Sequence, residues 1–142
     1  MTKIYNNLKI PNFGIYDFDI LYDDSYKKFI PKSYGNDEHR ECVELIKKIK
    51  ADLKDNKKFK DGGLAAISDP KLKEKVMELF ADLKSKGVIL LRRGCLETSL
   101  VEFGVPYTDR GKKNWLSDAI DCMNKLTPEE LEDSYIYKWI FQ

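Results

Sequence analysis

The sequence has few of the features that mark secreted, zinc-stabilised or membrane proteins. It contains three cysteines, none of which form a Cys-x-x-Cys pair, which argues against a disulfide framework and a structural zinc site. No apolar run approaches the roughly 18 uninterrupted residues of a membrane span. The first residues also lack the apolar core of a signal peptide. We therefore expect a soluble protein of the reducing cytoplasm.

A strong net charge is absent as well. Lysine and arginine number 25, and aspartate and glutamate number 24, which leaves a net charge of +1. No whole-molecule field therefore indicates a nucleic-acid partner, although local basic clusters could still contact one. The 142 residues suit one domain with a real core and show no internal repeat or low-complexity segment.

The pattern of apolar residues predicts an α/β fold. Residues 13–21 have the length and the Ile, Phe and Tyr content of a buried strand. Residues 88–91 form a short apolar run typical of a buried parallel strand. Between them, helical spacing predicts one helix over 37–54 and another that Asp69-Pro70 begins and Gly87 ends. This order of elements indicates a right-handed crossover, so the two strands should be parallel.

Further elements are predicted around this crossover. We expect a short edge strand within 3–10, a short helix over 24–30 and a basic surface loop over 55–68. A helix is expected over 115–126, and Thr127-Pro128-Glu129-Glu130 should open a last helix that continues to the chain end. That apolar C-terminal helix would join the core or dock a second subunit.

Two acids interrupt the first apolar stretch. On a strand, Asp17 and Asp19 would point to the same side, about 7 Å apart. Two buried carboxylates are unfavourable without a positive partner, and Mg²⁺ or Mn²⁺ is the simplest one. Glu97 follows the second strand and could face the same edge of the sheet, which would complete a metal site. Alternatively, the aspartates cap a helix or remain solvated, and Glu97 interacts with a helix dipole.

Basic residues near these acids are candidates for contact with phosphate. They are Lys57, Lys58 and Lys60 in the predicted loop, and Arg92 and Arg93 after the second strand. The alternative for the lysines is a solvated connection, and for the arginines it is ordinary surface charge.

Taken together, these segments resemble the C-terminal part of a TOPRIM domain. The segments are Gly14-Ile15-Tyr16-Asp17-Phe18-Asp19-Ile20-Leu21, a long helical insert, Gly87-Val88-Ile89-Leu90-Leu91 and Gly94-Cys95-Leu96-Glu97. The most similar version is that of the overcoming-lysogenization-defect (OLD) family of nucleases. The resemblance covers residues 13–125 of one truncated domain, with 126–142 as a C-terminal helix, and is sharpest at the Asp-x-Asp strand.

The resemblance implies a fold, an activity and a set of site residues. The fold would be a partial TOPRIM-like fold, with a small, mostly parallel sheet flanked by helices and a helical C-terminus. Family members bind divalent metal and cleave or nick DNA. Asp17 and Asp19 match the metal ligands, and Glu97 matches the glutamate of the Gly-x-Leu-Glu turn. Lys112 or Lys113 is the positional candidate for a catalytic lysine, with plain surface residues as the alternative.

The first part of the family pattern is missing. A TOPRIM domain begins with a strand and a turn that carry a glutamate, and no such segment precedes residue 13. The ATPase domain of the family is absent too. The resemblance therefore implies a partner, which would be the missing N-terminal half, an ATPase-bearing chain or a second copy of this chain.

Three functions remain open at this point. The first is a Mg²⁺- or Mn²⁺-dependent DNA nuclease module that is incomplete and weak on its own. The second is a non-enzymatic TOPRIM remnant or split subunit that binds a partner protein or DNA. The third is a phosphatase of the haloacid dehalogenase type, with Asp17 as nucleophile and Asp19 as acid. That family normally has Gly-Thr after the second aspartate, where Ile20-Leu21 stands here.

Overall fold

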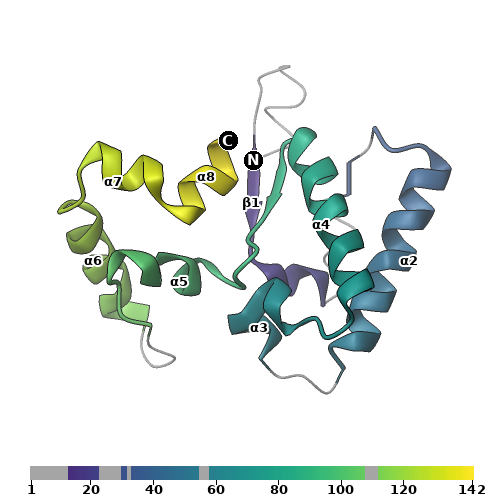
Figure 1. Cartoon of the computed structure of the whole chain (residues 1–142), viewed down its shortest axis with the longest axis horizontal. Helices are drawn as coiled ribbons and strands as arrows, with labels where there is room; N and C mark the ends of the chain where they lie inside the picture. The colour runs from purple at the N-terminus through teal and green to yellow at the C-terminus, as the bar shows by residue number, and fades with distance from the viewer. Residues whose placement is uncertain (1–12, 23–29, 32, 55–57, 108–111) are drawn as a thin grey trace. The chain divides into compact units, whose positions relative to one another are not determined.

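The computed structural model describes residues 13–22, 30–31, 33–54, 58–107 and 112–142 (Figure 1). This part of the chain is mostly helical and contains a small parallel sheet flanked by helices. Contacts divide the chain into two compact units, Met1–Cys95 and Leu96–Gln142. The predicted strand within 3–10 lies outside the described residues, as does nearly all of the predicted helix over 24–30.

The sheet of the first unit consists of β1 (Gly14–Tyr16) and β2 (Val88–Leu90) in its described part. The strands are parallel, with Ile15 opposite Ile89, which confirms the predicted parallel pairing. The ladder continues at its carboxyl end, where the Leu91 N–H donates to the Tyr16 carbonyl oxygen at 2.9 Å.

The first strand is shorter than predicted. It ends at Tyr16, and the chain then forms a 3₁₀ helix, η1 (Phe18–Leu21). Phe18 and Leu21 are both 1% exposed. A helical turn buries residues three apart on the same side, whereas the alternating faces of a strand would separate them. The prediction of a strand over 13–21 is therefore wrong beyond Tyr16, and the strand geometry expected for Asp17 and Asp19 does not apply.

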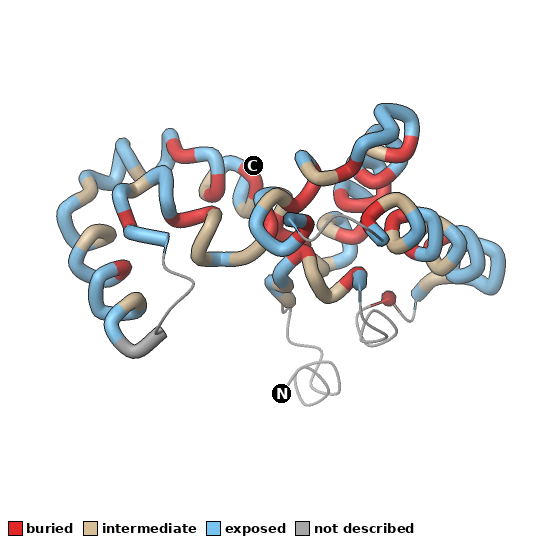
Figure 2. Tube along the Cα trace, turned by 90° about the horizontal axis from the view of Figure 1, so that it is seen from below, coloured by how far each residue is buried: buried red, intermediate tan, exposed pale blue. Residues whose placement is uncertain are grey.

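Two long helices lie between the two strands in the chain. They are α2 (Asn36–Asp52) and α4 (Pro70–Ser85), which confirm the helices predicted there. The Asp69 carboxylate accepts from the Lys71 N–H at 2.9 Å and caps α4, and Gly87 follows α4 with a φ of 81°. α4 packs on β2 and on α2. Figure 2 shows buried residues recurring between exposed ones along these helices; the shared core includes Ile46, Ile49, Val76, Phe80 and Leu83.

The predicted loop over 55–68 contains helical turns in its described part. These are α3 (Phe59–Gly62) and η3 (Gly63–Ala66). Phe59 and Leu64 are buried, which explains why this basic segment folds against the core. The ring of Tyr22 stacks on Phe59 with centroids 4.4 Å apart, so the end of η1 is joined to α3.

The second unit is helical in its described part. Its elements are α5 (Leu96–Ser99), η4 (Leu100–Phe103), α6 (Lys112–Met123), α7 (Pro128–Asp133) and α8 (Tyr135–Phe141). Thr127 and Glu130 form the predicted capping box. The single last helix that was predicted is broken at Ser134, whose extended backbone and side chain cap α8 instead. Glu102 also accepts from the N–H groups of Tyr135 and Ile136, at 3.1 and 3.0 Å.

Candidate functional site at the carboxyl edge of the sheet

Three segments of the first unit meet where the parallel strands end. The first is Asp17 with η1, the second is the loop 92–95 after β2, and the third is the turn from α3 into η3. The Phe18 N–H donates to the Gly94 carbonyl oxygen at 2.6 Å, and the Leu64 N–H donates to the Arg92 carbonyl oxygen at 2.9 Å. Backbone hydrogen bonds therefore hold all three segments together.

Two glycines allow this close approach. Gly63 has a φ of +54°, and a Cβ atom there would lie 2.2 Å from the Arg92 carbonyl oxygen. Gly94 has a φ of +102°, and a Cβ atom there would lie 2.1 Å from the Lys60 carbonyl oxygen. Any larger residue would meet backbone atoms and adopt an unfavourable conformation. Gly63 and Gly94 are thus packing features that position Lys60 at the sheet edge.

The two sequence-predicted acids lie at this edge. Asp17 is exposed and directly follows β1, at the position before the first residue of η1. Asp19 lies in the first turn of η1, with 43% of its side chain exposed, and its Oδ2 atom is 3.9 Å from Lys60 Nζ. An exposed pair at this distance contributes at most about 1 kcal/mol to stability. Asp19 therefore remains accessible to an additional ligand.

Basic side chains follow the second strand at the same edge. Arg92 is half-buried and Arg93 is exposed, directly beyond the buried Leu91. Lys58 is exposed at the start of α3, whereas Lys57 lies outside the described residues. The structure thus brings Lys60 and the loop with both arginines to the edge that bears the aspartates, as expected for loops after parallel strands.

The other predicted site residues belong to the second unit. Glu97 is part of α5, and Lys112 and Lys113 begin α6. Their grouping with the aspartates stays a prediction. Among the described residues, no three His, Cys, Asp or Glu side chains gather closely enough to hold a metal ion.

The donor set at the sheet edge fits an open magnesium site rather than a closed one. Asp17 and Asp19 supply carboxylate oxygens from positions two apart, and such hard donors suit Mg²⁺ or Mn²⁺. Mg²⁺ usually keeps several waters and is bound by one or two carboxylates together with a phosphate group. Two aspartates beside basic residues match that requirement.

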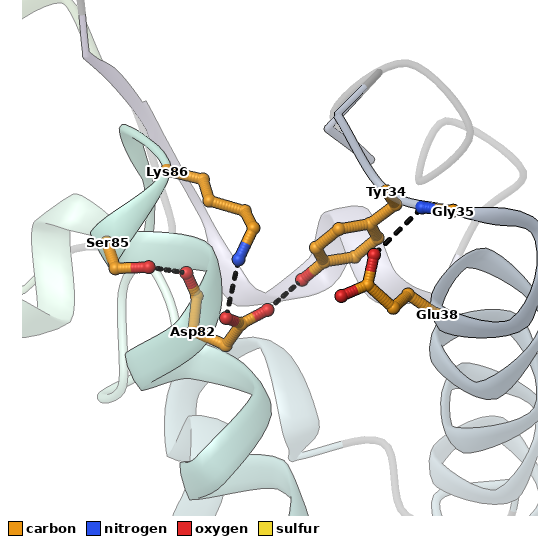
Figure 3. A network of polar contacts seen from close by, with 6 residues as sticks. All are labelled: Tyr34, Gly35, Glu38, Asp82, Ser85 and Lys86. Carbon is orange, nitrogen blue, oxygen red and sulfur yellow. Dashed lines mark hydrogen bonds and ion pairs between the residues drawn. The ribbon is translucent and has the colours of Figure 1, made fainter.

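A second polar region lies between α2 and α4, and no sequence motif indicated it. It is an open groove of about 600 Å³, lined among others by Tyr34, Glu38, Cys42, Glu78 and Asp82. Figure 3 shows the Tyr34 hydroxyl donating to one Asp82 oxygen, while Lys86 Nζ lies 2.7 Å from the other. Lys86 also lies over the Tyr34 ring, 5.1 Å from its centroid.

The ionisable groups of this groove influence one another. The hydrogen bonds from Lys86 and Tyr34 lower the pKa of Asp82. Burial, followed by the bond to Asp82, raises the pKa of Tyr34. Burial and the Asp82 charge raise the pKa of the Cys42 thiol to about 11. Tyr34 precedes α2, whereas Asp82 and Lys86 lie in α4 and at its C-terminal end. Because these three side chains bind one another, we interpret the network as a contact that stabilises the fold.

Comparisons with family models, with curated proteins and with solved structures gave no match for this chain. The resemblance to a TOPRIM domain therefore depends on the Asp-x-Asp segment and the Gly94-Cys95-Leu96-Glu97 segment of the sequence. Within the described residues, no helix is long and apolar enough to cross a membrane.

Proposed function

We propose that this chain is a TOPRIM-like module of the OLD type that binds Mg²⁺ or Mn²⁺ and the DNA backbone at the carboxyl edge of its sheet. Its activity would be metal-dependent cleavage of phosphodiester bonds, weak or absent until a partner completes the site. The observation that carries this proposal is the parallel pairing of β1 with β2, because it gathers acidic and basic side chains at one edge.

Each group at this edge has a role in the proposal. Asp17 and Asp19 hold the metal ion, which when bound would supply an activated water and stabilise the leaving oxygen. Arg92, Arg93 and Lys60 contact the phosphate oxygens, where charge-assisted hydrogen bonds are strongest. The sequence resemblance adds two further roles to the proposal. Glu97 would be a further metal ligand, and Lys112 or Lys113 would be the catalytic lysine.

The small number of ligands supports an incomplete site. Two carboxylates leave most of the coordination shell to water, so the metal affinity of the chain alone should be modest. The described sheet also has only two short strands. A partner that extends this sheet, whether a missing N-terminal half, an ATPase-bearing chain or a second copy, would supply further ligands.

Nicking of supercoiled plasmid tests the proposal. The wild type, the Asp17→Ala/Asp19→Ala double variant and a Glu74→Ala control on the exposed side of α4 are purified identically and assayed in Mg²⁺ and in Mn²⁺. We expect metal-dependent nicking by the wild type and the control and none by the double variant. Mn²⁺ binding, followed by electron paramagnetic resonance, serves as a second measurement. Equal Mn²⁺ binding by the wild type and the double variant would contradict the metal site.

A second candidate function is a binding subunit without catalysis. Phe13 and Ile15 are 71% and 51% exposed on and beside β1, and an exposed apolar strand favours pairing with another chain. Sedimentation of the wild type and of Ile15→Lys measures this. A self-association that Ile15→Lys abolishes, combined with Mn²⁺ binding that is absent, would favour the binding subunit over the nuclease.

A further inference from the structure

The charges of α2 are divided between its two ends. Residues 36–45 contain four acids and one arginine, whereas residues 46–54 contain four lysines and one aspartate. That aspartate, Asp52, accepts a hydrogen bond from the Ser68 N–H at 3.0 Å. In a chain with a net charge of +1, the C-terminal half of α2 and the two residues after it are therefore a locally basic segment, in which Lys47 also lies 2.9 Å from the Glu44 carboxylate.

The basic surface continues beyond the helix to the candidate site. Lys54, Lys58 and Lys60 are all exposed. Both α2 and α3 contact η1, which carries Asp19, and Lys60 Nζ is 3.9 Å from that carboxylate. We name Lys47, Lys50, Lys54, Lys58 and Lys60 the basic track.

The spacing of the basic track fits a nucleic-acid backbone. Lys47 and Lys50 are three residues apart, so they share one face of α2, and Lys54 follows two residues after the helix ends at Asp52. From Lys47 to Lys50 the helix advances about 4.5 Å, which is close to the step of about 3.4 Å between nucleotides of one strand. Helix-dipole stabilisation accounts for cations in the last turn of a helix only, whereas the basic track continues beyond α2 to Lys58 and Lys60.

We propose that the basic track guides a DNA duplex to the carboxyl edge of the sheet by contacts with successive phosphates. The choice of DNA rests on the proposed function, whereas the location of the track rests on the charges of α2 and α3. Because phosphate contacts release counterions, binding along the track should be independent of sequence and strongly dependent on salt.

Fluorescence anisotropy with a labelled 20-base-pair duplex in EDTA tests this proposal without the metal site. Lys47→Gln/Lys54→Gln/Lys58→Gln should weaken binding about tenfold or more, and its salt slope should decrease by about 0.9 for each lysine removed. The matched control, Lys71→Gln/Lys73→Gln/Lys75→Gln, removes three lysines that lie outside the basic track, in the N-terminal half of α4, and should bind like the wild type. Circular dichroism checks that each variant is folded, and Lys→Arg at the three track positions should restore binding.

Several outcomes would overturn the track. They are an equal loss in both triple variants, no loss in the track variant, no binding of duplex by the wild type, or binding of phosphatidylserine vesicles in place of duplex. The Asp17→Ala/Asp19→Ala variant separates the two proposals, because it should keep its DNA affinity in EDTA. DNA binding that depends on the basic track, without metal-dependent nicking, would therefore refute the nuclease proposal and support the track proposal. Metal-dependent nicking by a chain whose DNA binding does not depend on the track would support the nuclease proposal and refute the track proposal.

Discussion

Two polar regions of the first unit differ in how they are built. The groove between α2 and α4 is a recess of about 600 Å³, but its central side chains, Tyr34, Asp82 and Lys86, bind one another. The carboxyl edge of the sheet is instead assembled from three segments by backbone hydrogen bonds and close glycine contacts. There, Asp19 has a long contact of 3.9 Å with Lys60. An edge that backbone contacts hold together and that exposes charged side chains is a better sign of a binding site than a large recess whose central side chains bind one another.

The largest expected effect concerns the glycines of the sheet edge. Gly94→Ala should lower the free energy of unfolding by about 3 kcal/mol or more, because a residue held at positive φ is strained and its Cβ atom would meet the Lys60 carbonyl oxygen at 2.1 Å. Gly63→Ala should behave similarly because of the Arg92 carbonyl oxygen. Urea unfolding followed by circular dichroism measures both changes.

Two other glycines are suitable controls. A Cβ atom at Gly62 would meet Ala66 at an ordinary 3.4 Å, so Gly62→Ala should be nearly neutral. Gly104 has a φ of +77° with nothing within 4 Å, so Gly104→Ala should cost only the conformational strain, about 1 kcal/mol. If Gly94→Ala and Gly62→Ala had equal effects, the sheet edge would not be built around close glycine contacts.

These glycine contacts illustrate what the sequence could and could not predict. Helices α2 and α4 and the caps at Asp69 and Thr127 depend on local patterns, and they were predicted. The end of β1, the turns of α3 and the pairing of Tyr34 with Asp82 depend on residues dozens of positions apart, and local patterns do not contain that information. Ser134 was an available signal for the break before α8, since serine favours the N-cap position.

The candidate site was partly predictable for the same reason. The crossover order of the elements placed Asp17 and the two arginines at one sheet edge, and the parallel pairing is observed. The position of Lys60 could not be predicted in this way, because Gly94 and Gly63 bring it there through contacts between segments about thirty residues apart. The role of Glu97 depends on the second unit and stays a prediction.

The next effect concerns the buried thiol of the groove. The pKa of Cys42 is raised from 9.0 to about 11, so above about pH 9 the unfolded chain loses a proton that the folded chain retains. The free energy of unfolding should therefore fall as pH rises, by about 2 kcal/mol between pH 9 and pH 11. Urea unfolding at several pH values measures this slope, and Cys42→Ala should reduce it. An equal slope in Cys42→Ala would assign the loss to other groups, such as Tyr34, whose raised pKa acts in the same direction.

A smaller effect is expected for the hydrogen bond that joins Tyr34, before the start of α2, to Asp82 in α4. Tyr34→Phe removes the hydrogen bond to Asp82 and should lower the free energy of unfolding by about 1 kcal/mol. The same bond helps to lower the pKa of Asp82, so this pKa should rise in the variant. Carboxyl-carbon NMR titration measures the shift, with Tyr137→Phe in α8 as the control. Because the pKa of folded Asp82 is depressed, its contribution to stability is present above pH 3.8 and is lost as pH falls through the folded pKa.

The smallest change in stability is expected for Asp19→Asn. The exposed contact with Lys60 at 3.9 Å contributes little, so the free energy of unfolding should change by no more than about 0.5 kcal/mol. Under the proposed function, Mn²⁺ affinity should nevertheless fall about tenfold or more, because one of the two proposed carboxylate ligands loses its charge. Paramagnetic resonance titration and urea unfolding of the same preparation measure both quantities, with Glu74→Gln as the control.

The two measurements on Asp19→Asn show whether the carboxyl edge of the sheet behaves as a binding site or like the groove between α2 and α4. When a group that stabilises the fold is changed, such as Tyr34 in the groove, the free energy of unfolding of the protein should fall. Its Mn²⁺ affinity should stay the same. A group that is held in place for binding should show the opposite behaviour, since its charge remains accessible and contributes little to folding. A large loss of stability in Asp19→Asn with unchanged Mn²⁺ binding would therefore place Asp19 in the same class as the groove residues, and the sheet edge would no longer be the better candidate site.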